Sequence, residues 1–166
     1  KGVILAGGNG TRLLPLTRTT NKHLLPIYDK PMIYYPIQTL KNANITEIMV
    51  VTSGEHAGNV FRLLGSGKEF GVEFTYKIQD EAGGIAQALG LAEKFIGNDK
   101  FVVILGDNIV SESIREHTEL FEKSENKSHI LLTYVPREAS KKLGVAIMEG
   151  SRIIRFVEKP TDPPED

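Results

Sequence analysis

The sequence lacks cysteine, a marked excess of charge of either sign, and any apolar run long enough to cross a membrane. Because there is no cysteine, disulfide bonds and thiolate metal sites are excluded. The formal net charge of −1 shows no basic excess of the kind that marks nucleic-acid binding. The first residues show no signal-peptide pattern. We therefore expect a cytoplasmic protein that binds neither nucleic acid nor a membrane.

The size and composition are those of one ordinary domain. The chain has 166 residues, of which 40% are hydrophobic and 25% charged, enough to bury a core. It contains no internal repeat and no linker. The composition changes only from Pro160 onward, where the end Pro163-Pro164-Glu165-Asp166 indicates a cut or a disordered tail. We expect one domain over residues 1–166, with residues 160–166 as a tail.

One stretch, residues 2–26, combines a short apolar run with a glycine-rich loop. Val3 to Ala6 are followed at once by Gly7-Gly8-Asn9-Gly10-Thr11-Arg12. Glycine tolerates positive φ and lets the backbone approach a ligand, and consecutive backbone N–H groups can form a nest for phosphate oxygens. Arg12 adds a fork of donors that fits a phosphate, and Lys22 is the next cation along the chain. This stretch predicts a nucleoside-triphosphate site.

Two common glycine-rich loops do not fit this stretch. A Walker loop requires a Lys-Ser or Lys-Thr pair after its glycines, and none follows here. A dinucleotide-binding loop requires a third glycine where this chain has Leu13, and Pro15 argues against an immediate long helix. A tight turn after a strand, without any ligand, is an equally good interpretation of the glycines alone.

Strand and helix patterns alternate along most of the chain. Apolar runs and period-two alternation predict strands at residues 2–6, 47–52, 72–78, 101–105, 129–135, 144–149 and 152–158, with a hairpin turn at Glu149-Gly150. Helical spacing of apolar residues predicts helices at residues 32–43 (beginning near Pro36), 56–64, 84–96 and 111–123. The alternation predicts an α/β fold with a largely parallel sheet.

Three polar or glycine-rich segments follow strands of this predicted sheet: Gly7–Arg12, Gln79–Gly84 and Gly106–Asn108. Ligands of parallel sheets bind at the carboxyl ends of the strands, so we expect the three segments to meet at one edge. Asp107 is placed to hold Mg²⁺, a hard ion that prefers oxygen ligands, although an aspartate that caps the next turn would leave the same pattern. Gln79 could hydrogen-bond a pyrimidine edge or be a surface loop residue.

We expect no histidine to bind a metal ion and neither Tyr34 nor Tyr35 to bind a base. The four histidines, at positions 23, 56, 117 and 129, show no paired metal-ligand spacing, so we expect each to be structural or solvated. Tyr34 and Tyr35 lie in a predicted helix, and we expect them to pack rather than to stack on a base.

Residues 7–36 as a whole resemble the signature of the sugar-nucleotide nucleotidyltransferases. Gly7 to Thr17 match G-G-x-G-T-R-L-x-P-x-T, and Lys22-His23-Leu24-Leu25-Pro26 supplies the lysine and L-P that follow. Residues 27–36 are most similar to the glucose-1-phosphate thymidylyltransferases within that family. The uridylyltransferases usually have proline before the lysine, where this chain has Asn21.

The resemblance implies a three-layer, Rossmann-like fold of the nucleotide-diphospho-sugar transferase type, with helices on both faces of a mostly parallel sheet. It also implies that Asp107, in Leu105-Gly106-Asp107-Asn108, is the Mg²⁺ ligand, and that the segment from Gln79 to Ala88 reads the base. The residues implied to bind the nucleotide are Leu5, Ala6, Gly7, Gly8, Gly10, Thr11, Arg12, Lys22, Gln79, Gly84 and Asp107. Those implied to bind the sugar phosphate are Leu105, Asn108, Gly144, Glu158 and Lys159.

The reaction implied by the resemblance is transfer of a nucleotidyl group from a nucleoside triphosphate, with dTTP favoured, to a sugar 1-phosphate, with glucose 1-phosphate favoured. The catalytic residues would be Arg12 on the pyrophosphate, Lys22 on the triphosphate, Asp107 on Mg²⁺ and Lys159 on the attacking phosphate. Catalysis would consist mostly of positioning and charge neutralisation.

Members of that family continue well beyond the E-K-P segment, so we expect this chain to be incomplete at its C-terminus, and the full-length form to be a homo-oligomer. Two alternatives stay open. One is a UTP-dependent uridylyltransferase, and the other is a non-catalytic domain that binds a nucleotide or a sugar phosphate.

Overall fold

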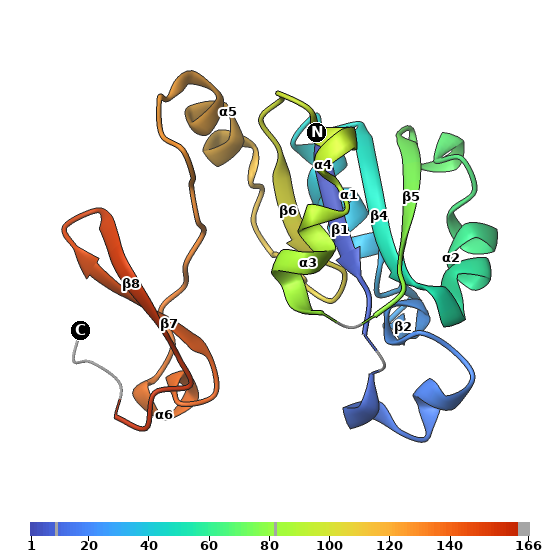
Figure 1. Cartoon of the computed structure of the whole chain (residues 1–166), viewed down its shortest axis with the longest axis horizontal. Coiled ribbons are helices and arrows are strands. Elements are labelled where there is room, and N and C mark those ends of the chain that lie inside the picture. The colour runs from blue at the N-terminus through green and yellow to red at the C-terminus, as the bar shows by residue number, and fades with distance from the viewer. Residues whose placement is uncertain (9, 82, 163–166) are drawn as a thin grey trace. The chain divides into compact units, whose positions relative to one another are not determined.

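The computed structural model describes residues 1–8, 10–81 and 83–162, and Figure 1 shows their elements. Residues 9, 82 and 163–166 lie outside the described residues and include most of the predicted tail at residues 160–166. The chain forms two compact units, Lys1–Asn126 and Lys127–Asp166. That residues 1–166 act as one domain stays a prediction. In the described part of the chain, no helix is both long and apolar enough to span a bilayer.

The first unit is built on a four-stranded sheet with the order β5-β4-β1-β6. The strands are β1 (Gly2–Ala6), β4 (Glu47–Ser53), β5 (Glu73–Gln79) and β6 (Val102–Leu105). Every pairing is parallel, with Ile4 of β1 opposite Val50 on one side and Ile104 on the other. All carboxyl ends therefore lie at the same edge, which confirms the predicted parallel sheet.

Helices cover both faces of this sheet, so the predicted three-layer arrangement is confirmed (Figure 1). Helices α1 (Tyr34–Asn42) and α2 (Ala57–Leu64) pack in one core with alternate residues of β1 and β4. Helices α3 (Gly84–Gly90) and α4 (Glu93–Ile96) pack in a second core with the intervening strand residues. Because side chains alternate along a strand, Ile4 enters the first core and Leu5 the second.

Short turns occupy the stretch between β1 and α1, for which the periodicity predicted no element. The 3₁₀ turns are η1 (Thr11–Leu13), η2 (Leu16–Arg18) and η3 (Lys22–Leu24), followed by the two-residue strands β2 (Pro26–Ile27) and β3 (Lys30–Pro31). Two more 3₁₀ turns, η4 (Gly54–His56) and η5 (Lys68–Phe70), flank α2. These turns connect the carboxyl end of β1 to the start of α1.

Two helix predictions are right in type but wrong in extent. The predicted helix at residues 84–96 is broken at Leu91 and Ala92, where the Ala92 N–H bonds to the Leu89 carbonyl in a tighter turn after the weak helix former Gly90. The helix predicted at 111–123 is α5 (Arg115–Lys123), because Ser113 Oγ accepts from the Arg115 N–H and so ends the preceding turn.

The strand predicted at residues 129–135 is wrong, because no described strand pairs with it. The second unit instead contains α6 (Arg137–Ser140) and the antiparallel pair β7 (Gly144–Glu149) and β8 (Arg152–Glu158). The hairpin turn lies one residue later than predicted, at Gly150-Ser151, since Glu149 still pairs with Arg152 and Gly150 takes the positive φ of +59°.

Candidate functional site

A cavity of about 260 Å³ lies at the carboxyl ends of the strands in the first unit. It draws together the three segments that the sequence placed at this edge. The predicted site residues that line it are Leu5, Gly7, Gly8, Lys22, Gln79, Gly84, Leu105 and Asp107. Three further residues line it: Ile85 and Ala88, which belong to the segment implied to read the base, and His23, which was expected to be structural or solvated. A second hollow of about 210 Å³, between α1 and residues 110–113, is lined by none of the predicted site residues.

Five predicted residues of the first unit do not line the cavity: Ala6, Gly10, Thr11, Arg12 and Asn108. Ala6 is buried at the end of β1. Gly10 precedes η1, on which Thr11 and Arg12 are exposed. Asn108 is exposed, and its backbone N–H bonds to the Leu105 carbonyl in the turn that follows β6.

Glycines shape the loop that leaves β1. Gly8 and Gly10 have φ of +98° and +58°, a region that other residues rarely adopt. A Cβ on Gly10 would lie 2.8 Å from Thr17 Cγ2, and one on Gly7 would lie 2.7 Å from Gln79 Oε1. Close packing therefore leaves no room for a side chain at Gly7 or Gly10, and at Gly10 the positive φ opposes one as well. Gly7 makes room for Gln79, which lines the cavity.

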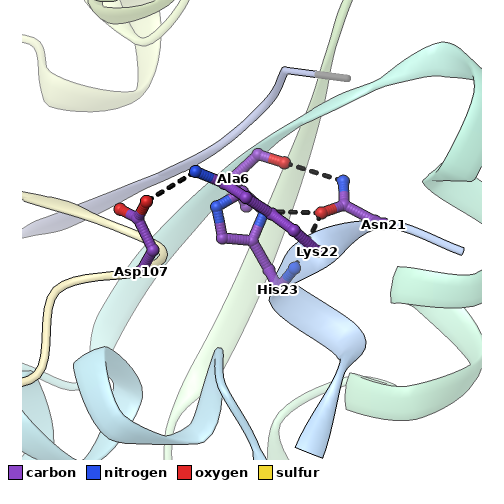
Figure 2. Close-up of polar contacts among 5 residues, drawn as sticks. All are labelled: Ala6, Asn21, Lys22, His23 and Asp107. Atoms are coloured by element: carbon purple, nitrogen blue, oxygen red, sulfur yellow. Dashed lines mark hydrogen bonds and ion pairs between the residues drawn. The ribbon is translucent and has the colours of Figure 1, made fainter. Parts of the chain in front are cut away.

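Lys22 and Asp107 form an ion pair at the cavity, with 2.5 Å between Nζ and Oδ2 (Figure 2). Their side chains are 26% and 36% exposed, so water reaches both. Partial burial alone would raise the pKa of Asp107, but the hydrogen bond and charge of Lys22 outweigh it and hold the net pKa below its usual value. The Asp107 carboxyl is therefore ionised at neutral pH.

Asp107 could hold a metal ion only together with ligand oxygens. In the described part of the chain, no three His, Cys, Asp or Glu side chains cluster into a metal site. Mg²⁺ commonly binds through one or two carboxylates plus substrate phosphates, and a single half-exposed carboxylate at a cavity fits that pattern.

Gln79, at the end of β5, is oriented by Gln87, a residue of the same segment to which no role of its own was assigned from the sequence. Its Nε2 donates to Gln87 Oε1 at 2.6 Å, with a longer contact of 3.5 Å to the Gly84 carbonyl. Gln87 lies on α3, three residues after Gly84. The resemblance to the family in residues 84–88 could have indicated that Gln87 matters. The spacing of the residues does not show that Gln87 contacts Gln79.

Asn21 and His23 form a buried polar pair on either side of Lys22, and each is 1% exposed. Asn21 Nδ2 donates to the Ala6 carbonyl at 3.0 Å, and Asn21 Oδ1 lies 3.0 Å from the His23 backbone N and 2.6 Å from His23 Nδ1 (Figure 2). Burial, and next the charge of Lys22, lower the pKa of His23 to about 4. His23 is thus a neutral structural histidine, as predicted.

The predicted sugar-phosphate residues of the second unit gather at one end of its hairpin. Gly144 pairs with Glu158 across β7 and β8, and a Cβ on Gly144 would lie 3.1 Å from Glu158 Oε2. The Lys159 backbone N–H donates to the Leu143 carbonyl, and Lys159 Nζ lies 3.6 Å from Glu158 Oε1. These three residues are therefore adjacent to one another.

Comparison with known proteins agrees with the fold and with the family predicted from the sequence. A protein of Bacillus anthracis, assigned as a glucose-1-phosphate thymidylyltransferase and crystallised with sucrose, is 53% identical, with a TM-score of 0.93 over 98% of this chain and 65% of that one. A UDP-glucose pyrophosphorylase complexed with UDP-glucose is 28% identical, with a TM-score of 0.75 over 96% of this chain and 68% of its own.

Among curated proteins, the glucose-1-phosphate thymidylyltransferase of Neisseria meningitidis is 41% identical over 168 residues, which is all of this chain and 58% of the relative. The chain thus spans little more than half the length of that relative. The sequence model of the family described as "Nucleotidyl transferase" matches residues 1–166, through both units. The chain belongs to the nucleotidyl transferase family.

Proposed function

We propose that the chain binds a nucleoside triphosphate in the cavity of its first unit and serves in nucleotidyl transfer to a sugar 1-phosphate. The favoured reaction is dTTP plus glucose 1-phosphate giving dTDP-glucose and pyrophosphate. One observation carries the proposal: Lys22, Asp107, Gln79 and the glycine loop, which come from four separate segments, line a single cavity. The relatives named for this activity support the choice of reaction.

The transfer needs positioned cations rather than a protein nucleophile. A phosphate oxygen of the sugar 1-phosphate would form a bond to the α-phosphorus as the bond to the β-phosphate bridging oxygen breaks, and pyrophosphate leaves. Lys22 and the backbone of Gly7 and Gly8 would bind the triphosphate at the cavity wall, and Arg12 on η1 would bind the pyrophosphate.

Asp107 would hold Mg²⁺ jointly with phosphate oxygens. The ion would supply neutralisation of the charge that builds up around the α-phosphate. Before the ligand enters, Lys22 occupies the Asp107 carboxylate. A triphosphate offers Lys22 a more highly charged partner, and its arrival would therefore release Asp107 for the metal.

The orientation of Gln79 supports a base with an N–H at position 3. Its Nε2 is engaged by Gln87, and in the described part of the chain no donor bonds to its Oε1. A free acceptor suits the N3–H of thymine and of uracil, whereas N3 of cytosine is itself an acceptor. The arrangement therefore favours dTTP or UTP over CTP. The choice of dTTP between these two rests on the names of the relatives.

Each unit carries residues that we propose for the sugar phosphate. Leu105 ends β6, and Asn108 lies in the turn that follows it. In the second unit, Gly144, Glu158 and Lys159 adjoin one another. Lys159 would position the attacking phosphate, and Glu158 would accept from sugar hydroxyl groups. A cytoplasmic location would supply both substrates.

A homo-oligomer is also part of the proposal for the full-length form. Light scattering of a longer form would give its mass in solution, and a mass of one subunit would contradict the oligomer.

The direct test is pyrophosphate release from dTTP, UTP, CTP and ATP, each with glucose 1-phosphate, with and without Mg²⁺. We would assay this chain and a chimera in which it is joined to the C-terminal region of the Bacillus anthracis relative. Magnesium-dependent release that is fastest with dTTP supports the proposal, and fastest release with UTP would make the protein a uridylyltransferase. If the folded chimera releases no pyrophosphate but the chain binds dTTP, the non-catalytic alternative is correct.

A further inference from the structure

We propose that Asn21 and His23 are positioning residues for the nucleotide site, a buried pair that fixes Lys22 between the carboxyl ends of β1 and β6. This inference rests on the proposed function, because it assigns the pair a role in binding the triphosphate. The three residues are consecutive, but they lie in different environments. Asn21 and His23 are 1% exposed, whereas the Lys22 side chain between them is 26% exposed and lines the cavity.

Asn21 ties the start of η3 to the end of β1. Its Nδ2 donates to the carbonyl of Ala6. Ala6 is the last residue of β1, the strand that leads into the glycine loop. Its Oδ1 accepts from the His23 backbone N–H, which is the contact expected of a helix N-cap. The Lys22 backbone is thereby held at a set place relative to β1.

His23 ties the same turn to the end of β6. A Cβ on Gly106 would lie 2.7 Å from His23 Cδ2 and 3.1 Å from its Nε2, so the imidazole lies directly against the residue that precedes Asp107. The His23 carbonyl also accepts from the Ile33 N–H at the start of α1. Asn21 and His23 thus contact the ends of β1 and β6. The Lys22–Asp107 ion pair lies between these two strand ends (Figure 2).

The hydrogen bonds of Asn21 determine the proton position on His23. Because Nδ2 donates to Ala6, the atom 2.6 Å from His23 Nδ1 is an acceptor, and Nδ1 must carry the hydrogen. The wild-type protein without nucleotide should therefore hold His23 as the Nδ1–H tautomer. A pair that merely fills space makes no such demand.

The first test is the ¹⁵N spectrum of the histidine side chains at neutral pH, with the His23 signals assigned by their loss in His23→Gln. We expect the Nδ1–H tautomer in the wild-type chain and its loss in Asn21→Ala. An Nε2–H tautomer in the wild type would overturn the inference whether or not any variant folds.

The second test is calorimetric binding of dTTP in a double-mutant cycle of Asn21→Ala and Lys22→Ala. Each single change should weaken binding by about tenfold, as expected when a charge-assisted hydrogen bond is lost or misplaced. The double variant should bind no more weakly than Lys22→Ala, because without the lysine there is nothing left to position. His23→Phe, which keeps a ring against Gly106 but lacks the donor, should resemble Asn21→Ala, and His23→Gln, which keeps a donor, should bind nearly as the wild type does.

Tyr35→Phe is the matched control. It removes a side-chain bond to a backbone carbonyl, that of Ile27, which lies in the same part of the chain but outside the cavity. It should leave dTTP binding unchanged. Losses that multiply in the double variant would overturn the positioning role and leave the proposed function intact. If the folded wild type binds no nucleoside triphosphate, the proposed function fails and the positioning role with it, even where the tautomer is as expected.

Discussion

Lys22 and Asp107 are 85 positions apart in the sequence and meet in an ion pair at the cavity. In the proposed function each has another partner, the triphosphate for Lys22 and a metal ion for Asp107. The unliganded pair is therefore a competitor of the metal, since one carboxylate oxygen already receives an ammonium hydrogen bond. This competition predicts the order in which ligands bind.

We predict that divalent metal binds weakly to the free chain and more tightly once dTTP is present. Mn²⁺, followed by electron paramagnetic resonance, is a suitable stand-in for Mg²⁺. Removing the competing cation in Lys22→Gln should raise the Mn²⁺ affinity of the free chain by about tenfold, the worth of a charge-assisted hydrogen bond. Because dTTP itself chelates Mn²⁺, a titration of dTTP alone serves as the control. An unchanged affinity in Lys22→Gln would contradict the competition.

His23 predicts a pH dependence of stability. Its pKa is lowered to about 4 in the folded chain, below the ordinary 6.5, so between these values the unfolded chain binds more protons. The free energy of unfolding should therefore fall as pH falls from 6.5 to 4, with His23 accounting for about 3 kcal/mol at pH 4. The lowered pKa of Asp107 also costs stability in acid, but mainly below its ordinary 3.8.

Urea unfolding of wild type and His23→Phe at pH 7.5 and pH 4 would measure this contribution. The variant should lose less stability than the wild type over that range. Parallel losses in the two proteins would show that His23 is not buried as a neutral group.

At the scale of elements, the loop after β1 is held in shape by glycine. Gly10 has φ of +58°, and a Cβ there would lie 2.8 Å from Thr17 Cγ2. Gly58, in α2, has no positive φ, and a Cβ there would meet no described atom outside its own helix within 4 Å. The two glycines therefore form a matched pair for substitution.

We predict that Gly10→Ala lowers the free energy of unfolding by about 1–3 kcal/mol, because the left-handed backbone and the contact with Thr17 both oppose a side chain. Gly58→Ala should raise it by about 0.5–1 kcal/mol through the higher helix propensity of alanine. Urea denaturation gives both values. Equal effects of the two changes would contradict the conformation described for the loop.

Local patterns predicted most elements of the first unit, because the strands are continuous apolar runs and the helices have one apolar face. They failed where a neighbour decides the outcome. Ile130 and Leu132 have the composition of a strand, but a strand forms only with a partner, and no described strand pairs with this segment. The break between α3 and α4 leaves Ala88, Ala92 and Ile96 in one core, so the apolar spacing alone could not reveal it.

The same limit applies to the candidate site. Lys22 and Asp107 were predicted because strand ends and a signature segment indicate them directly. Asn21 contacts Ala6, and Gln87 contacts Gln79, across separate segments of the chain. His23 is buried because it lies in the 3₁₀ turn η3. Neither spacing nor composition specifies those contacts.

At the scale of the whole molecule, the chain carries two units that one family model spans. It covers 58% of the Neisseria meningitidis relative and 65% of the Bacillus anthracis one. The cavity of the first unit is formed within that unit alone, so nucleotide binding should survive without the remaining length. Turnover also requires a complete sugar-phosphate site, to which we expect the remaining length of the relatives to contribute, and the chimera should therefore exceed the chain alone.

The most direct measurement of the central claim is magnesium-dependent pyrophosphate release from dTTP and glucose 1-phosphate by the chimera and by its Asp107→Ala variant. We predict a loss of at least about a hundredfold in the variant, because no other described carboxylate lines the cavity to bring a metal to the phosphates. Asp99→Ala, which removes the exposed partner of Lys1, should keep full activity. Near wild-type release by a folded Asp107→Ala variant would contradict the account.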